Sequence, residues 1–159
     1  MNSINITDIK SFMSKLLIKE DFDFFLVEEA SITTFNTFNI DGHIIKSYYE
    51  PNELEKLQDT SLSSWGAIKH ICFFLIKGKR TPSRFKFVFK ANADIVSKII
   101  SSEALSFNEN DIAGLYLNIK YENNSLNCIT AISMNTFTMD KTIEKAWDKY
   151  IETLLNNIC

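Results

Sequence analysis

The architecture is clearest from residues 140–158, which read DKTIEKAWDKYIETLLNNI. Its apolar residues recur at steps of three and four over about four turns, and charged residues cover the other side. This spacing predicts an amphipathic helix with Asp140 as its N-cap. The apolar side is wide enough to need a sheet beneath it. It consists of Ile143, Ala146, Trp147, Tyr150, Ile151, Leu154, Leu155 and Ile158.

Two segments upstream predict that sheet. Residues 84–90 alternate strictly, with Phe85, Phe87 and Phe89 on one face and Arg84, Lys86, Val88 and Lys90 on the other. Residues 114–121 and 125–133 predict a hairpin closed at Asn123-Asn124, with a strand that continues as far as Met139 in one reading. In this register Leu115, Leu117, Ile119 and Tyr121 share a face with Leu126, Cys128, Thr130 and Ile132.

The first third of the chain predicts one helix and three strands. The helix runs from about Thr7 to Lys19, because apolar residues recur there at helical spacing. The strands are 22–28, 31–40 and 43–49. Asp41-Gly42 is expected to close a type I′ hairpin, which would place Phe38 opposite Ile45 and Thr34 opposite Tyr49. In a strand, Glu28 and Glu29 would point to opposite faces.

The middle of the chain predicts further helices. A short one covers 52–57, a polar connection runs from Gln58 to Ser64, and a helix at 65–77 has Ser63 or Ser64 as its cap. Residues 71–76 also fit a strand. Asn92 caps a helix that extends to about Ala104.

The resulting order, α-β-β-β-α-β-α-β-β-α, indicates a single α+β domain over residues 1–159, with a mostly antiparallel sheet and helices packed on one face. An alternative is a sliding-clamp-like arrangement of two helix-plus-strands units, residues 4–49 and residues 64–91 with 113–139. That reading rests on element order alone.

Composition narrows the class of protein. The 159 residues are 45% hydrophobic with a net charge of −3, which indicates a globular chain without a global attraction to nucleic acid or membranes. Cys72, Cys128 and Cys159 suggest neither a disulfide framework nor a metal site, and the first two fall on core faces. There is no signal-peptide pattern and no apolar run of about 20 residues. We therefore expect a cytoplasmic protein.

One segment is a candidate binding site. Residues 77–90 hold 6 of the 17 basic residues and no acidic residue: Lys77, Lys79, Arg80, Arg84, Lys86 and Lys90. Such a cluster can neutralise phosphates. The alternative is a solvated turn beside a charged edge strand. The glycine spacing is not that of a Walker loop.

No catalytic motif is visible. His43 and His70 have no metal-ligand spacing, so we expect no metal and no cofactor. The leading hypothesis is therefore a non-catalytic binding module for nucleic acid, a nucleotide or an acidic protein surface. One alternative is a nucleic-acid-associated clamp-like protein. A second is an enzyme whose site is assembled from residues distant in sequence, with a deep pocket that holds His43 or His70 beside a carboxylate. Another is an assembly subunit, which leaves a homo-oligomer open. No membrane partner is expected.

Three strings resemble an uncharacterised family of small conserved hypothetical proteins from clostridial-type bacteria. They are ASITTFNTF at 30–38, IKGKRTP at 76–82 and AWD at 146–148. The resemblance covers nearly the whole chain and implies a cytoplasmic protein of such bacteria. It implies no activity, and no functional residue can be transferred from it.

Overall fold

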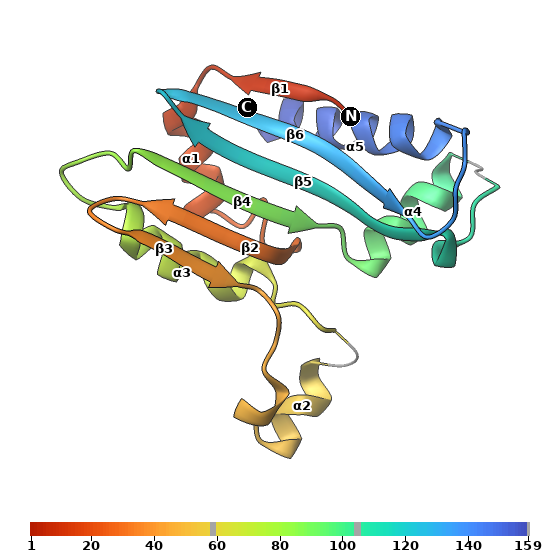
Figure 1. Cartoon of the computed structure of the whole chain (residues 1–159), viewed down its shortest axis with the longest axis horizontal. Coiled ribbons are helices and arrows are strands. Elements are labelled where there is room, and N and C mark those ends of the chain that lie inside the picture. The colour runs from red at the N-terminus through yellow and green to blue at the C-terminus, as the bar shows by residue number, and fades with distance from the viewer. Residues whose placement is uncertain (58–59, 104–105, 159) are drawn as a thin grey trace.

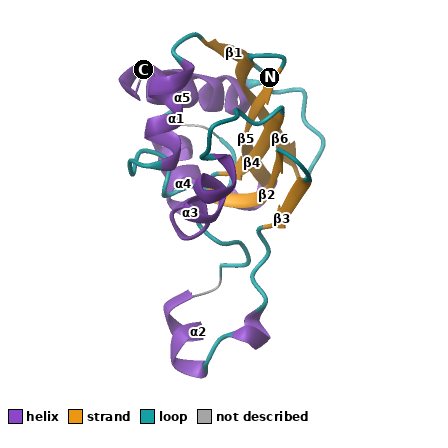
Figure 2. Ribbon diagram, turned by 90° about the vertical axis from the view of Figure 1, so that its left-hand side faces the viewer, coloured by secondary structure: helices purple, strands orange, loops and turns teal. Residues whose placement is uncertain are grey.

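The computed structural model describes residues 1–57, 60–103 and 106–158. Within them the chain forms two layers, a six-stranded antiparallel sheet and a layer of helices that covers one of its faces (Figures 1 and 2). The predicted α+β class with helices on one face is confirmed. The predicted helix end at Ala104, the start of the polar connection at Gln58 and the last cysteine, Cys159, lie outside the described residues.

The elements follow one another along the chain as the bounds below show. The strands are β1 (Ser3–Ile6), β2 (Leu26–Thr33), β3 (Thr37–Asp41), β4 (Arg84–Lys90), β5 (Ile112–Glu122) and β6 (Ser125–Met134). The helices are α1 (Ile9–Leu17), α2 (Pro51–Leu57), α3 (Trp65–Ile76), α4 (Ala93–Ser102) and α5 (Thr142–Ile158), with short 3-10 turns at Lys46–Tyr48 and Glu109–Asp111. Residues 71–76 are therefore helical.

The centre of the sheet forms as predicted. β5 and β6 pair so that Tyr121 lies opposite Leu126 and Leu117 opposite Thr130. Asn123 and Asn124 both have positive φ, as a type I′ turn requires. The Phe85, Phe87 and Phe89 side chains of β4 are buried beneath the helices, so this aromatic stripe belongs to the core.

Helix α5 packs its predicted apolar side on this sheet. Trp147 is fully buried, and its indole Nε1 donates to the carbonyl oxygen of Tyr116 on β5 at 2.9 Å. The helix begins at Thr142 rather than at Asp140, because the Asp140 carboxylate accepts from the backbone N–H of Thr142 and so holds a turn that precedes the helix. β6 ends at Met134, and the predicted extension to Met139 is wrong.

The prediction fails most clearly between Phe22 and Tyr49. Residues 22–25 form tight turns instead of a strand, and these turns bury both Phe22 and Phe25. The predicted strand 31–40 is broken at residues 34–36, where the chain reverses between β2 and β3. The hairpin therefore closes there and not at Asp41-Gly42. Consequently Phe38 pairs with Ile32 instead of Ile45.

Gly42 has a different role from the predicted one. A Cβ at this position would lie 1.6 Å from the carbonyl oxygen of Val27, so glycine is needed because two backbone segments pass in contact. The Gly42 N–H donates to the Glu28 carbonyl at 3.0 Å, and its own carbonyl accepts from Ser63 N–H at 2.9 Å. The predicted third strand, 43–49, is replaced by an irregular segment and a 3-10 turn.

An arm projects from the body of the molecule after this point (Figures 1 and 2). It comprises residues 43–57 and 60–62 and carries α2. Its base is held by backbone hydrogen bonds between the outgoing and returning segments of the arm, such as Ile44 N–H to the Ser61 carbonyl at 2.8 Å. Neither α2 nor the 3-10 turn buries a residue.

The strand order is β1-β6-β5-β4-β2-β3. β1 pairs with β6 and β2 pairs with β4, so the first of the two proposed clamp-like units is divided across one continuous sheet. It also lacks its third strand. The topology therefore gives no two separate helix-plus-strands units. Among the described helices, none is long and apolar enough to cross a membrane.

Candidate functional site

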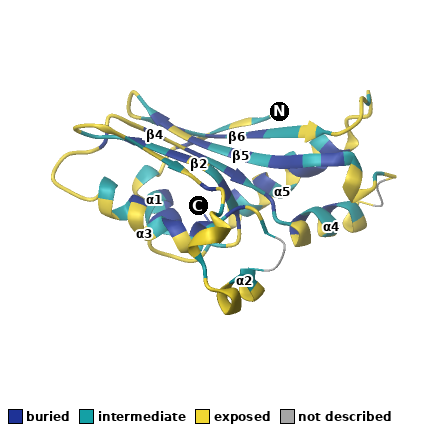
Figure 3. Ribbon diagram, turned by 60° about the horizontal axis from the view of Figure 1, so that its bottom comes forward, coloured by how far each residue is buried: buried dark blue, intermediate teal, exposed yellow. Residues whose placement is uncertain are grey.

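The described helices leave the second face of the sheet uncovered (Figures 2 and 3). The predicted cations of β4 point to this open face, because they alternate along the strand with the buried Phe85, Phe87 and Phe89. Along β4, exposed or half-buried residues alternate with buried ones. The register between strands arranges the outward residues in rows. One row is Ser31, Lys86, Lys120 and Asn127, and the next is Thr33, Arg84, Glu122 and Ser125.

Lys120 joins the predicted cations in these rows. It is the direct cross-strand partner of Lys86, and directly opposed Cβ atoms lie about 5 Å apart. Arg84 lies two residues from Lys86 on the same face of β4. The three side chains surround part of a shallow hollow of about 390 Å³. The sequence placed a cluster of cations on β4 alone among the strands. The structure brings the positive charges of β4 and β5 together on this face.

Two carboxylates partly balance this charge. Glu29 Oε1 lies 3.6 Å from Lys86 Nζ, and Glu122 Oε2 lies 3.6 Å from Lys120 Nζ. All four side chains are exposed by 43% or more. Exposed ion pairs of this kind are weak, at about 0.2–1 kcal/mol each. An anionic ligand can therefore compete for both lysines.

The loop before β4 brings more cations to the same end of the sheet. Lys79 and Arg80 are exposed in it, and the loop joins the sheet where Ser83 N–H donates to the Thr33 carbonyl at 3.0 Å. Among the described residues, no ion pair includes Lys79, Arg80 or Arg84. We call Lys79, Arg80, Arg84, Lys86 and Lys120 the cationic end.

The remaining two predicted residues lie elsewhere. Lys77 ends α3, and its Nζ lies 5.1 Å from the centroid of the Phe74 ring. Lys90 is at the far end of β4, with Nζ 6.0 Å from the Tyr116 ring centroid. The segment 77–90 is therefore not one patch, because its strand is about 20 Å long and its loop begins in the helix layer.

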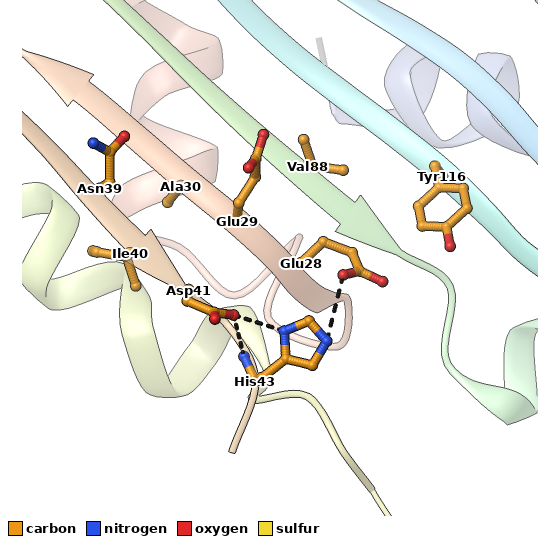
Figure 4. A pocket seen from close by; sticks show the side chains of 9 residues that line it. All are labelled: Glu28, Glu29, Ala30, Asn39, Ile40, Asp41, His43, Val88 and Tyr116. Carbon is orange, nitrogen blue, oxygen red and sulfur yellow. Dashed lines mark hydrogen bonds and ion pairs between the residues drawn. The ribbon is translucent and has the colours of Figure 1, made fainter. Parts of the chain in front are cut away.

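A second hollow, of about 640 Å³, lies beside the first on the open face and reaches the base of the arm (Figure 4). His43 lies between two carboxylates there. Its Nδ1 is 2.6 Å from Asp41 Oδ1, and its Nε2 is 3.9 Å from Glu28 Oε2. A β-bulge between Val27 and Glu29 makes this possible, since it turns both Glu28 and Glu29 toward the open face. The expectation that these two glutamates point to opposite faces is wrong.

The electrostatics of this hollow favour a protonated histidine. The hydrogen bond that the His43 ring donates to the Asp41 carboxylate raises the pKa of His43, and the nearby charge of Glu28 adds to that effect. The backbone and side-chain hydrogen bonds of His43 in turn lower the pKa of Asp41. Burial, with the charge of Glu28, raises the pKa of Tyr116. The His43 side chain is 59% exposed, so water reaches the pair freely.

The other residues that could take part in catalysis, Cys72 and His70, do not line this hollow. Burial raises the pKa of the Cys72 thiol to about 12, which leaves it protonated and unreactive at neutral pH. His70 lies exposed on α3. Within residues 1–57, 60–103 and 106–158, no group of three histidine, cysteine or acidic side chains is placed to hold a metal ion.

Sequence reasoning missed Lys120 as a member of the cationic end, and it missed Glu29 and Glu122 as the acids that pair with Lys86 and Lys120. The alternation in β5 did show Lys120 on an outward face, but only the β4–β5 pairing places it opposite Lys86. The enzyme alternative did place His43 beside a carboxylate, but sequence reasoning did not identify Asp41 and Glu28 as its partners. The i, i+2 spacing of Asp41 and His43 was a usable signal, whereas the third member depends on the bulge.

Comparison with known proteins gives one match. The model of a family of unknown function (DUF5721) matches residues 15–158. No curated protein and no solved structure matches the chain. Because the match spans nearly all of the sheet and helix layers described above, the chain belongs to this family of unknown function, DUF5721.

Proposed function

We propose that the chain is a non-catalytic binding module whose cationic end binds nucleic acid. The observation that carries this proposal is the direct cross-strand pairing of Lys86 with Lys120 on a sheet face that none of the described helices covers. Like charges in directly opposite positions destabilise a sheet. An anion bound between them removes that repulsion, so binding and folding are favoured together.

The layout of the cations suits an extended ligand. Lys79 and Arg80 lie in the loop, while Arg84, Lys86 and Lys120 continue along the open face. The hollow between the strand residues is shallow and open, so it would bury little of a single nucleotide. A linear polyanion can instead contact several of these side chains at once and release counterions from each phosphate.

The second hollow supports a non-catalytic reading. Electrostatic stabilisation of a transition state is strongest where water is excluded and the polar groups are held in low dielectric. His43 is 59% exposed, and its two neighbours are carboxylates at the rim of an open depression. This arrangement suits a charged surface contact better than a proton-transfer site.

The test is retention on heparin and binding to labelled DNA as a function of salt. If each of the five cations neutralises one phosphate, the log–log slope is about −3.5 for a single strand, and raising the salt from about 50 to about 200 mM weakens binding about 130-fold. The triple variant Lys79→Glu, Arg80→Glu, Lys86→Glu should lose both retention and binding.

A matched control keeps the total charge change equal. Lys10, Lys98 and Lys145 are exposed on α1, α4 and α5 of the helix layer. Changing these three to Glu should leave most of the binding intact. Equal losses in the two triple variants would show that only net charge matters and would contradict the proposal.

A further inference from the structure

Strand β3 lies at an edge of the sheet, and among the described strands only β2 pairs with it. The ladder between them is fixed at both ends, by Thr34 N–H to the Asn36 carbonyl at 2.9 Å and by Gly42 N–H to the Glu28 carbonyl at 3.0 Å. In an antiparallel ladder every second residue bonds to the neighbouring strand. The alternate residues of β3 therefore direct their backbone N–H and C=O groups away from β2. They are Thr37, Asn39 and Asp41.

This edge is not protected against pairing. Edge strands often carry a lysine, a proline or a bulge that prevents them from binding another strand. β3 reads TFNID and keeps one register with β2 along its whole length, so it has none of these three features. It therefore presents a row of hydrogen-bonding groups that a further strand can use.

The sequence of β3 is complementary to itself in a register centred on Asn39. If Asn39 lies opposite the same residue of a second copy, Thr37 falls opposite Asp41 and Phe38 falls opposite Ile40. The outward-facing residues then form the hydrogen-bonded pairs, and Phe38 and Ile40 form the closer pairs between them. Both apolar residues lie on the helix side, because each is opposite a buried residue of β2. Apolar side chains thus meet on one face and polar ones on the other, with no two like charges opposed.

The arm extends in the direction in which this second copy would lie. Figures 1 and 2 show that it leaves the end of β3 and runs outward past this edge of the sheet. Its Ile45 and Tyr48 side chains are 68% and 84% exposed, and α2 buries no residue. A helix as short as α2 is unstable by itself in water and needs packing against a neighbour. A second copy at the edge would supply that neighbour.

The same register places an exposed ring where the arm of the second copy begins. Continued beyond β3, it puts Phe35 opposite His43, the first residue of the arm. Phe35 is 85% exposed and contacts Phe38 edge-on, with ring centroids 5.6 Å apart, so it lies toward the helix side. At about 150–250 Å² for each aromatic side chain, Phe35 and Tyr48 of two copies would bury about 600–1,000 Å². A stable interface needs about 1,200–2,000 Å², and the paired strands and Ile45 supply the remainder.

We propose that two copies of the chain pair through β3 as a two-fold symmetric dimer, with each arm laid over the Phe35 turn of the other copy. The two sheets join into one, and both the open face and the helix layer continue across the axis. Such an interface is closed, so it stops at two copies. It is independent of nucleic-acid binding, because the cations of β4 and β5 lie on strands away from this edge.

The first test is the mass of the full chain by sedimentation equilibrium over a range of concentrations. The wild type should rise from the mass of one chain to that of two. Asn39→Pro removes an outward N–H and places a ring at the two-fold axis. Proline is accepted in an edge strand where the N–H faces solvent, so this variant should fold, as circular dichroism will show, and stay monomeric.

The second test uses charge to read the register. Thr37→Lys places an ammonium group opposite Asp41 of the other copy and should tighten the dimer, whereas Thr37→Glu should weaken it. Each shift should be about 2- to 30-fold, because the dimer contains the new pair twice. Both variants lose the same contact with the Thr33 hydroxyl, so their difference reports the charge. The controls Ser133→Lys and Ser133→Glu make equal charge changes on β6, which three strands separate from β3.

Four results would overturn the proposal. They are a wild type with the mass of one chain at every concentration, a mass that rises beyond two chains, a folded Asn39→Pro that dimerises as the wild type does, and Thr37 variants that shift the dimer no more than the Ser133 controls. If Asn39→Pro does not fold, the order Thr37→Lys, wild type, Thr37→Glu in dimer affinity decides the question.

Discussion

Removing the two acids of the open face should make the protein bind more tightly. Glu29 pairs with Lys86 and Glu122 pairs with Lys120, each at 3.6 Å. The double variant Glu29→Gln, Glu122→Gln frees both lysines and keeps the side-chain shape. A gain in affinity is more diagnostic than a loss, because an unfolded variant cannot produce it.

The size of the gain follows from the geometry. Both pairs are exposed, and such pairs contribute about 0.2–1 kcal/mol each. If the ligand no longer competes with either carboxylate, binding should tighten by about 0.4–2 kcal/mol, or about 2- to 30-fold. The folded protein should lose less than about 2 kcal/mol of stability, since the same two pairs are all that is removed.

The assay is anisotropy of a labelled oligothymidylate at several salt concentrations, with a control of equal charge. Glu103 pairs with Lys149 at 3.5 Å in the helix layer, and Glu55 is exposed on the arm. The control variant Glu55→Gln, Glu103→Gln changes the net charge by the same amount. Unchanged affinity of the open-face variant, or an equal gain in the control, would refute the reasoning.

Three further predictions concern the fold and the second hollow. Trp147→Phe removes the donor to the Tyr116 carbonyl and leaves a space, so the free energy of unfolding in urea should fall by about 2–3 kcal/mol. Gly42→Ala places a methyl group 1.6 Å from the Val27 carbonyl oxygen and should cost about 3 kcal/mol or more, seen as a lower melting temperature. The raised pKa of His43 contributes stability that is fully present below its ordinary value of about 6.5 and is lost as the pH rises through the folded value. Asp41→Asn should lower the His43 pKa in an NMR titration and remove that part of the pH dependence.

Much of the fold can be read from local patterns where one face is apolar and the other polar. The Phe85, Phe87, Phe89 alternation, the 112–134 hairpin and α5 each have one strong period, and each forms with the predicted register or face. Residues 22–28 show no single hydrophobic period, because apolar residues stand at consecutive positions there. There the burial of Phe22 and Phe25 by turns is decided by tertiary contacts with Phe89 and Phe12.

Glycine signals were ambiguous for a physical reason. Asp41-Gly42 matches the composition of a hairpin turn, but Gly42 is required for close backbone contact with Val27, and the reversal occurs at residues 34–36 instead. The same sequence type serves both purposes. Only the packing of the arm base against β2 distinguishes them.

The candidate site was predictable in part. Arg84, Lys86 and the loop cations stood out because they are close in sequence. Lys120, Glu29 and Glu122 belong to the same surface through strand order, which hydrophobic periodicity does not determine.

The most direct test of the cationic end is an NMR titration of the ¹⁵N-labelled protein with oligothymidylate. This measurement maps the contact surface without any mutation. We expect the largest shifts at Lys79, Arg80, Arg84, Lys86 and Lys120. Shifts centred on His43 and Tyr116 or on the arm, or no shifts at all, would contradict it.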